Sequence, residues 1–352
     1  MPPPPDPRPL YRFCVSPAGV LTALAGTALL VWVVAALGPA AIAADVRQVG
    51  WGIAAIVALG GFRFLLRAAA WRMCLDPPHA LRLRDAFAAV ICGDAIGNVT
   101  PLGPIVGEPA KAAFVRGRVA LAPAVTALAI ENVLYTLSAA AMIAAGMVAL
   151  LVRFELPADR AGVAMRGIGE IAVAATILLF AVALWLLWRQ PALISRALGL
   201  APPFRKHIDR MRDLESQIYT FAFRHRSSLP GIAAAEIGFH ALGVAEVYLT
   251  LWMLNGSPPS ILTSFILETA NRLITVVFKF VPLRLGVDEA GTAGFARIIG
   301  VGAKTGLSLA IVRRIRVLFW AAAGGILLVR AGVSTGMMRA ARHDQESHSR
   351  PE

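Results

Sequence analysis

Blocks of mostly apolar residues, each about as long as a bilayer is thick, divide this sequence. A helix of about 20 apolar residues spans the hydrocarbon core. Lipid cannot hydrogen-bond a bare backbone, so only helices and closed barrels cross it, and the short alternating pattern of a barrel is not seen. The sequence therefore predicts an all-α polytopic membrane protein with about six full spans, at residues 18–43, 50–71, 121–152, 168–188, 230–254 and 305–329.

The charge of the chain fits the same class. The formal net charge is +13, which in a soluble protein would suggest nucleic acid. In a polytopic membrane protein, excess Lys and Arg collects in cytoplasmic loops instead, so we expect no nucleic-acid partner. The cysteines Cys14, Cys74 and Cys92 lack the spacing of a metal site or a disulfide framework. We expect no metal and no cofactor.

Two further apolar regions, residues 85–118 and 261–300, are interrupted by proline, glycine and charge. The interruptions read LGPIVGEP and VPLRLGVDEAG. Broken helices at membrane depth are tolerated where they are buried in protein or line a cavity. The sequence predicts a re-entrant helical hairpin in each region.

The two interrupted regions are related by a shift of 181 residues. Over positions 101–130, eleven of thirty residues are identical to those at 282–311, where chance would give roughly two or three. Each copy has a Pro-Leu break, a glycine-containing turn, a Glu seven residues after the proline and a short helix. The positions expected to shape the hairpins are the matched prolines, Pro101 and Pro282, and one turn glycine in each copy, Gly107 and Gly286.

The distribution of basic residues predicts that both termini are cytoplasmic. Segments then placed inside carry 17 Lys and Arg, and those outside carry four. Lys279, Arg284, Arg297 and Lys304 oppose this, because they would lie in the outward-facing hairpin. With this topology the two copies enter from opposite sides and form an inverted repeat, the arrangement that places a substrate site between broken helices in transporters.

The expected domain organisation is one membrane domain, residues 18–333, between two tails. Residues 1–17 are predicted to be a disordered, proline-rich cytoplasmic tail, and residues 334–352 a disordered C-terminal tail. Within the cytoplasmic loop 189–229, residues 204–226 have the pattern of a basic amphipathic helix. It either lies on the anionic inner leaflet or packs on the helical bundle, and both interpretations stay open.

Charged residues in the two copies are the candidate substrate-binding or translocation residues. Glu108 and Glu289 occupy equivalent positions, where a carboxylate either caps a short helix or faces a polar cavity. Arg313 and Arg316 share a helical face, and guanidinium suits phosphate, although pairing with the acids of the second copy is an alternative. The candidates are Glu108, Lys111, Asp288, Glu289, Arg313, Arg314 and Arg316.

Other polar residues in apolar segments have simpler interpretations. Glu236 and His240 lie four residues apart, and we expect hydrogen bonding between helices rather than a metal site. Arg63 and Arg67 are expected to extend toward the head groups. No nucleophile motif, zinc-protease motif or phosphate-binding glycine loop is present, so we expect no catalytic residues and no enzyme activity.

The paired motifs NVTPLGPIVGEPAKAAFVRGR and VPLRLGVDEAGTAGFARIIGV, followed by LAIVRRIRVLFWAAAGG, resemble the membrane region of lysylphosphatidylglycerol synthases and related flippase-like proteins. The resemblance covers roughly residues 18–330 and implies a protein that translocates or handles a lipid. No aminoacyl-transferase domain follows, so we do not expect lipid aminoacylation. Lys111 and Pro109 depart from the Arg-rich, proline-free helix start expected of the family, which affects the geometry of the first hairpin.

These observations predict a lipid flippase or transporter of a bacterial-type inner membrane. It would move a phosphate-bearing lipid, such as an aminoacyl-phospholipid, a polyprenyl-linked lipid or a hopanoid-type lipid, through a cavity between the hairpins. The alternative is a non-transporting scaffold for a lipid-modifying enzyme or glycosyltransferase, with the repeats packed shut. A polar cavity at the repeat interface would distinguish the two.

Overall fold

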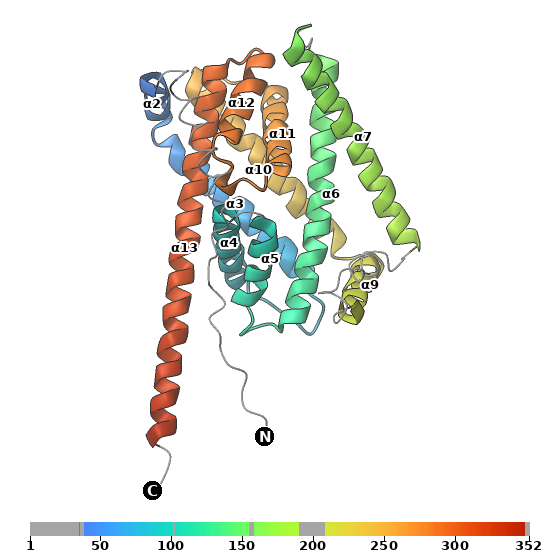
Figure 1. Ribbon diagram of the computed structural model, residues 1–352, viewed down its shortest axis with the longest axis vertical. Helices are drawn as coiled ribbons and strands as arrows, with labels where there is room; N and C mark the ends of the chain where they lie inside the picture. Colours follow the sequence, from blue (N-terminus) through green and yellow to red (C-terminus); the bar gives the residue numbers. More distant parts are fainter. Residues whose placement is uncertain (1–34, 36–38, 101–102, 155–157, 190–207, 349–352) are drawn as a thin grey trace.

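The computed structural model describes residues 35, 39–100, 103–154, 158–189 and 208–348, which form helices and turns and no strand (Figure 1). The first part of this range contains α2 (Pro39–Val49), α3 (Gly52–Met73), α4 (Leu83–Val99), α5 (Gly103–Phe114), α6 (Leu121–Arg153) and α7 (Arg160–Arg189). The second contains α9 (Ile208–Arg224), α10 (Leu229–Asn255), α11 (Ile261–Val277), the 3₁₀ turn η2 (Pro282–Arg284), α12 (Val287–Ile298) and α13 (Ala303–His348).

Four described helices are long and apolar enough to cross a membrane, which confirms the membrane class. They are α3, α6, the Gly162–Leu186 part of α7, and α10. The expected first span, 18–43, lies mostly outside the described residues. The expected last span, 305–329, lies within α13, which is not one of the four and carries three arginines within four residues.

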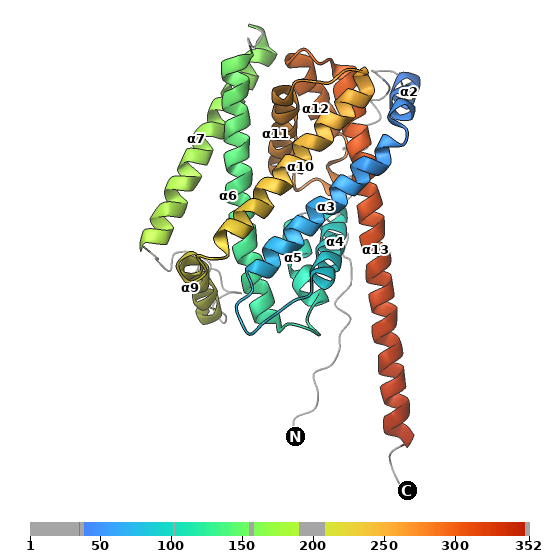
Figure 2. The ribbon, with the colours of Figure 1, turned by 180° about the vertical axis from the view of Figure 1, so that it is seen from behind.

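The sequence repeat corresponds to a repeat of helices. Adding 181 to the residue numbers places α3, α4, α5 and α6 on α10, α11, α12 and α13. α4 packs against α5, and α11 packs against α12, so each copy contains a helical hairpin. In Figure 1 the first hairpin lies in the lower half and the second in the upper half. α3 and α10 pack along each other as a diagonal pair, which lies in front of the hairpins in Figure 2.

The first hairpin, α4 and α5, is held by glycines spaced four residues apart on both helices. A Cβ added to Gly107 would lie 2.7 Å from the Gly93 carbonyl oxygen, and Gly103 is packed against Gly97 in the same way. Small residues at this spacing allow two helix backbones to approach closely in a membrane. Pro101 lies outside the described residues.

The second hairpin, α11 and α12, turns through a left-handed stretch of backbone. Leu283 and Arg284 have φ values of 51° and 50°, and Gly286 has φ 74°. Such values cost roughly 1–3 kcal/mol at a residue with a side chain and persist only where neighbours hold them. Arg314 of α13 supplies that contact, because its guanidinium donates to the carbonyls of Leu283 and Arg284.

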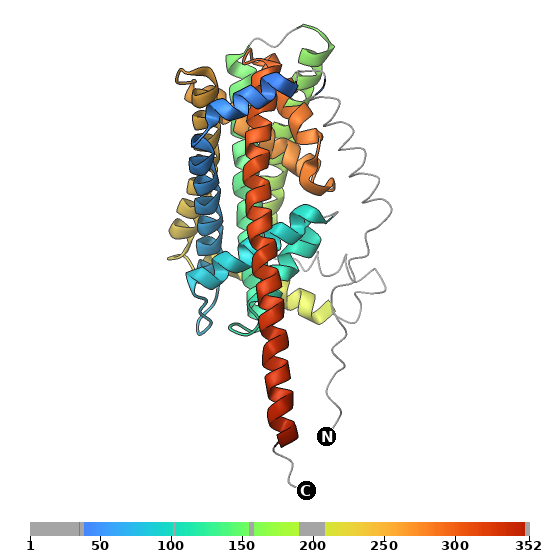
Figure 3. The ribbon, with the colours of Figure 1, turned by 90° about the vertical axis from the view of Figure 1, so that its left-hand side faces the viewer.

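The remaining helices surround the two repeats. α7 packs beside α6, and α9 contacts both (Figure 1). Ile218 and Phe221 of α9 pack on the core formed around α3 to α6. This helix therefore makes the contacts expected if residues 204–226 pack on the helical bundle. α13 runs along the whole bundle and continues to His348, through most of the predicted disordered tail (Figure 3). Alanine, methionine and arginine favour helix there.

Candidate functional site

A cavity of about 560 Å³ lies between the two hairpins. Its walls come from both copies of the repeat: α3, α4, α5 and α6 from the first, and α11, the turn after it, and α13 from the second. Residues of α7 and Phe239 of α10 complete the lining. The repeat interface is therefore open enough to hold a small group, rather than closed by side-chain packing.

One side of this cavity is strongly basic. Two carboxylates, Asp94 and Glu108, line it, together with eight cationic side chains. Those are Arg63, Arg67, Lys111, Arg272, Lys279, Arg284, Arg313 and Arg316. Burying positive charge inside a membrane protein costs free energy unless the charge is paired or meets a polar ligand. The partners of these cations therefore determine which ligands the cavity can hold.

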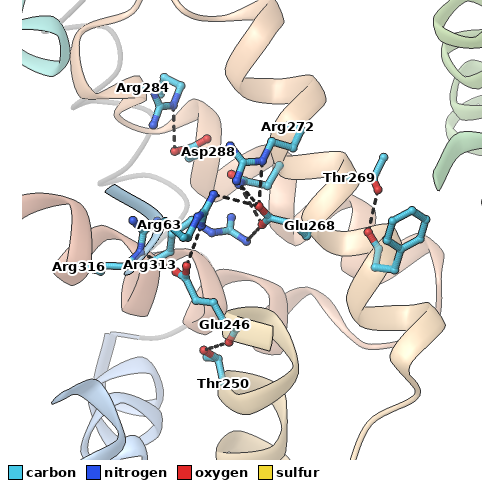
Figure 4. Close-up of polar contacts among 12 residues, drawn as sticks. Arg63, Glu246, Thr250, Glu268, Thr269, Arg272, Arg284, Asp288, Arg313 and Arg316 are labelled. Carbon is cyan, nitrogen blue, oxygen red and sulfur yellow. Dashed lines mark hydrogen bonds and ion pairs between the residues drawn. The ribbon is translucent and has the colours of Figure 1, made fainter. Parts of the chain in front are cut away.

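Two buried glutamates, Glu246 of α10 and Glu268 of α11, hold four of the arginines together (Figure 4). Glu246 binds Arg63 at 3.0 Å and Arg316 at 2.8 Å. The distances from Glu268 to the nearest nitrogens of Arg272, Arg63 and Arg313 are 2.6, 3.5 and 3.7 Å. We call these four arginines and two glutamates the arginine cluster.

Aromatic rings fix the positions of several of these cations. The guanidinium carbon of Arg63 lies 4.6 Å from the centre of the Phe239 ring, and that of Arg272 lies 4.9 Å from it. Arg67 lies 3.9 Å from the Tyr135 ring. A ring face attracts a guanidinium without neutralising it. These contacts orient the arginines and leave their charge available.

A second network lies beside the first hairpin. Arg67 binds Glu131 at 2.6 Å, and Lys111 binds Glu108 at 2.6 Å. Asn132 donates to Glu108 at 2.9 Å and joins the two pairs. In this network two cations face two carboxylates, so its charges balance, unlike those of the arginine cluster.

The lining that α6 and α7 contribute, across the bundle from α13 (Figure 1), is mostly apolar. It includes Ala139, Ala140 and Ile143 of α6 and Ala172 of α7. The cavity therefore has a cationic side and an apolar side. A ligand that is anionic at one end and hydrocarbon at the other fits both.

The structure separates the candidate residues predicted from sequence into two groups. Glu108, Lys111, Gly107, Arg313 and Arg316 line the cavity. The others, Asp288, Glu289 and Arg314 with Pro282 and Gly286, lie outside its lining and belong to the second hairpin and its support.

The two acids of the second hairpin form ion pairs with arginines of the chain itself, so their charge is balanced without a ligand. Arg314 binds Glu289 at 2.6 Å and lies 3.8 Å from Asp288, which Arg284 approaches to 3.4 Å. This is the pairing that the sequence left as an alternative to phosphate contact. The arrangement follows from helix geometry, because Arg314 is rotated about 100° from Arg313 around α13 while Arg316 returns to the side of Arg313.

Sequence reasoning placed Arg63 and Arg67 wrongly. Both were expected to extend toward head groups, but Arg63 is buried, Arg67 is half-buried, and both line the cavity and bind glutamates. α3 extends to Met73, so these residues lie well inside the helix. Their spacing of four residues on an otherwise apolar helix was the available signal.

Glu236 and His240 form the contact expected of them. Ser138 of α6 lies 3.1 Å from the Glu236 carboxylate and 3.1 Å from Nε2 of His240, which joins α6 to α10. Within the part of the chain that the structure describes, no group of three or more His, Cys, Asp or Glu residues could hold a metal ion.

Comparison with known proteins gives one match. The family described as the lysylphosphatidylglycerol synthase TM region matches residues 18–325. No curated protein and no solved structure matches the chain. The matched range contains both hairpins, the arginine cluster and the cavity. The chain therefore belongs to the family of the lysylphosphatidylglycerol synthase membrane region.

Proposed function

We propose that this protein is a lipid transporter of a bacterial-type inner membrane, which moves a phosphate-bearing lipid between leaflets through the cavity between its hairpins. The observation that carries the proposal is the two-sided cavity: cationic on the side of Arg63, Arg313 and Arg316, apolar on the side of Ala139 and Ala140. An amphipathic lipid needs both surfaces when its head group leaves the interface. The family is a membrane, lipid-related one, which agrees with this proposal.

The proposal includes the inverted topology predicted from the sequence. In it the two hairpins enter the membrane from opposite sides, both termini are cytoplasmic, and the cavity between the hairpin tips lies near the bilayer midplane. No chemical step is part of the proposal. The carboxylates of the cavity position the cations around the head group.

The test is lipid movement by the purified full chain in proteoliposomes. The probe is phosphatidic acid with a fluorescent acyl chain in the inner leaflet, which becomes accessible to external dithionite only after it crosses. Ala140→Trp places a large ring in the cavity, and Ala141→Trp places the same ring on the exposed side of the same helix. We expect the first substitution to lower the crossing rate at least about tenfold and the second to leave it unchanged.

Equal lipid crossing rates for wild type and Ala140→Trp would contradict transport through the cavity. If the wild type moves no lipid, the alternative function is favoured, in which the protein is a non-transporting scaffold for a lipid-modifying enzyme. In that case the protein should copurify with such an enzyme, and Ala140→Trp should not weaken the association.

A further inference from the structure

The arginine cluster carries more positive charge than its own carboxylates can neutralise. Its four arginines face two glutamates, which leaves two positive charges. The other ion pairs around the cavity leave this difference unchanged. Among the described residues, four further cations, Arg67, Lys111, Lys279 and Arg284, are equalled in number by the four acids Asp94, Glu108, Glu131 and Asp288, which line the cavity or pair with its cations. Glu236 accepts a hydrogen bond from Ser138 and forms no described ion pair with a cation of the cavity.

Titration cannot remove this surplus. Arginine stays protonated in proteins, and protonation of Glu246 or Glu268 would enlarge the excess rather than reduce it. Uncompensated buried charge is unfavourable, and no further acid among the described residues forms an ion pair with the cluster, so an anion bound in the cavity would supply the missing charge. The site is therefore built to attract an anion of two charges.

Arg313 is the arginine of the cluster with the fewest hydrogen-bond partners of its own. Its side chain is 5% exposed and lines the cavity. Its only described ion pair is the loose one with Glu268 at 3.7 Å, and no described group accepts a hydrogen bond from Nη1 or Nη2. Two parallel donors on one guanidinium match two phosphate oxygens.

We propose that Arg313, with Arg63, Arg272 and Arg316 around it, forms a seat for a phosphate group carrying two negative charges, as in a phosphomonoester or a diphosphate. The seat rests on the proposed function in one respect, because it specifies the head group of the lipid that the cavity takes. It disfavours zwitterionic head groups and single phosphodiesters, whose negative charge is too small to balance the cluster.

Ligand binding by the purified full chain tests this directly. The probes at pH 8 are dioctanoyl phosphatidic acid, dioctanoyl phosphatidylglycerol and sodium pyrophosphate, with sodium chloride added to hold the ionic strength constant. A phosphomonoester is mostly doubly charged at this pH, because its second pKa is about 6, whereas the phosphodiester of phosphatidylglycerol carries one charge. We expect the wild type to bind phosphatidic acid at least about tenfold more tightly than phosphatidylglycerol. Equal affinity for the two lipids overturns the seat, and this comparison needs no variant.

Substitution then locates the seat. Arg313→Gln reduces the surplus to one charge, so we expect about tenfold weaker binding of phosphatidic acid with no loss of thermal stability in the ligand-free protein. The control is Arg297→Gln, which removes an exposed arginine of α12 outside the cavity lining. Equal weakening in both variants would show a general charge effect and overturn the assignment.

Pyrophosphate identifies the source of the anion. Weaker binding of pyrophosphate than of phosphatidic acid assigns the seat to a lipid head group, and equal binding assigns it to a free anion. The transport proposal fails separately. A wild type that binds phosphatidic acid selectively but moves no fluorescent lipid keeps the seat and loses transport. Equal movement of the fluorescent lipid by wild type and Arg313→Gln, with equal affinity for phosphatidic acid, keeps transport and loses the seat.

Discussion

The two hairpins occupy equivalent places in the repeat but are held together by different chemistry. In α4 and α5, glycines bring one backbone against the other, and Gly107 has no room for even a methyl group beside Gly93. In α11 and α12, the turn takes a left-handed path that Arg314 supports through backbone carbonyls and Glu289. A shared sequence pattern has thus preserved the shape of the hairpin, but not what stabilises it.

The matched glutamates show the same divergence. The side chain of Glu108 is 27% exposed, lines the cavity and binds Lys111 and Asn132. The side chain of Glu289 is 1% exposed, lies outside the lining and binds Arg314. The partner on the following long helix is 24 residues away in the first copy and 25 in the second. In the repeat, Asn132 aligns with residue 313, one position before Arg314. This one-position difference in partner accompanies the change from Glu108, which lines the cavity, to Glu289, which stabilises the hairpin.

The largest effect is expected from Arg314→Gln, which removes the support of the second hairpin. Glu289 then stays buried without a cation, and the carbonyls of Leu283 and Arg284 lose their donor. Removing one partner of a buried ion pair costs about 3–5 kcal/mol. Equilibrium unfolding in mixed micelles should show this loss, and Arg297→Gln should show none. A loss below about 1 kcal/mol would mean that the turn is held by other contacts.

A smaller effect is expected from Gly107→Ala in the first hairpin. The new methyl group would meet the Gly93 carbonyl at 2.7 Å, and backbone cannot move aside as a side chain can. Overpacking of this kind costs about 1–3 kcal/mol. The matched control is Gly294→Ala in α12, where an added Cβ meets nothing within 4 Å and helix propensity should improve. Equal unfolding curves for the two variants would contradict the close backbone contact.

The smallest effect on stability, within about 1 kcal/mol, is expected from Glu108→Gln, because a partly exposed ion pair contributes little. Glu289→Gln is the comparison and should destabilise more, since Glu289 is fully buried with its arginine partner. Binding should respond in the opposite order. Glu108→Gln adds one positive charge to the cavity and should tighten phosphatidic acid binding, whereas Glu289→Gln should leave it unchanged in protein that folds.

The sequence predicted the helical class and the repeat because both depend on local signals. Apolar block length identified α3, α6, α7 and α10, and the 181-residue shift related the helices of one copy to those of the other. Helix periodicity indicated that Arg313 and Arg316 share a face, but it gave Arg314 no separate role. That Arg314 meets Glu289 could not be predicted, because it depends on how α13 is rotated against α12.

The cavity itself was harder to predict than the helices. Arg63 and Glu246 are 183 residues apart, and their contact arises from the packing of α3 along α10. Neither residue has an equivalent charge in the other copy, since residue 244 is Val and residue 65 is Leu. The repeat therefore could not reveal them. An arginine far from the ends of an apolar helix was the one sign of a buried partner.

The unequal charge of the arginine cluster also has an electrical consequence. Any displacement of the cluster along the membrane normal moves two elementary charges through part of the membrane potential, and the full potential contributes about 2.3 kcal/mol per charge for each 100 mV. A cell interior that is negative then draws the cluster inward. A bound dianion cancels the two charges, so the loaded site no longer responds to the voltage. The return of the site without its ligand would then be the step that the membrane potential drives.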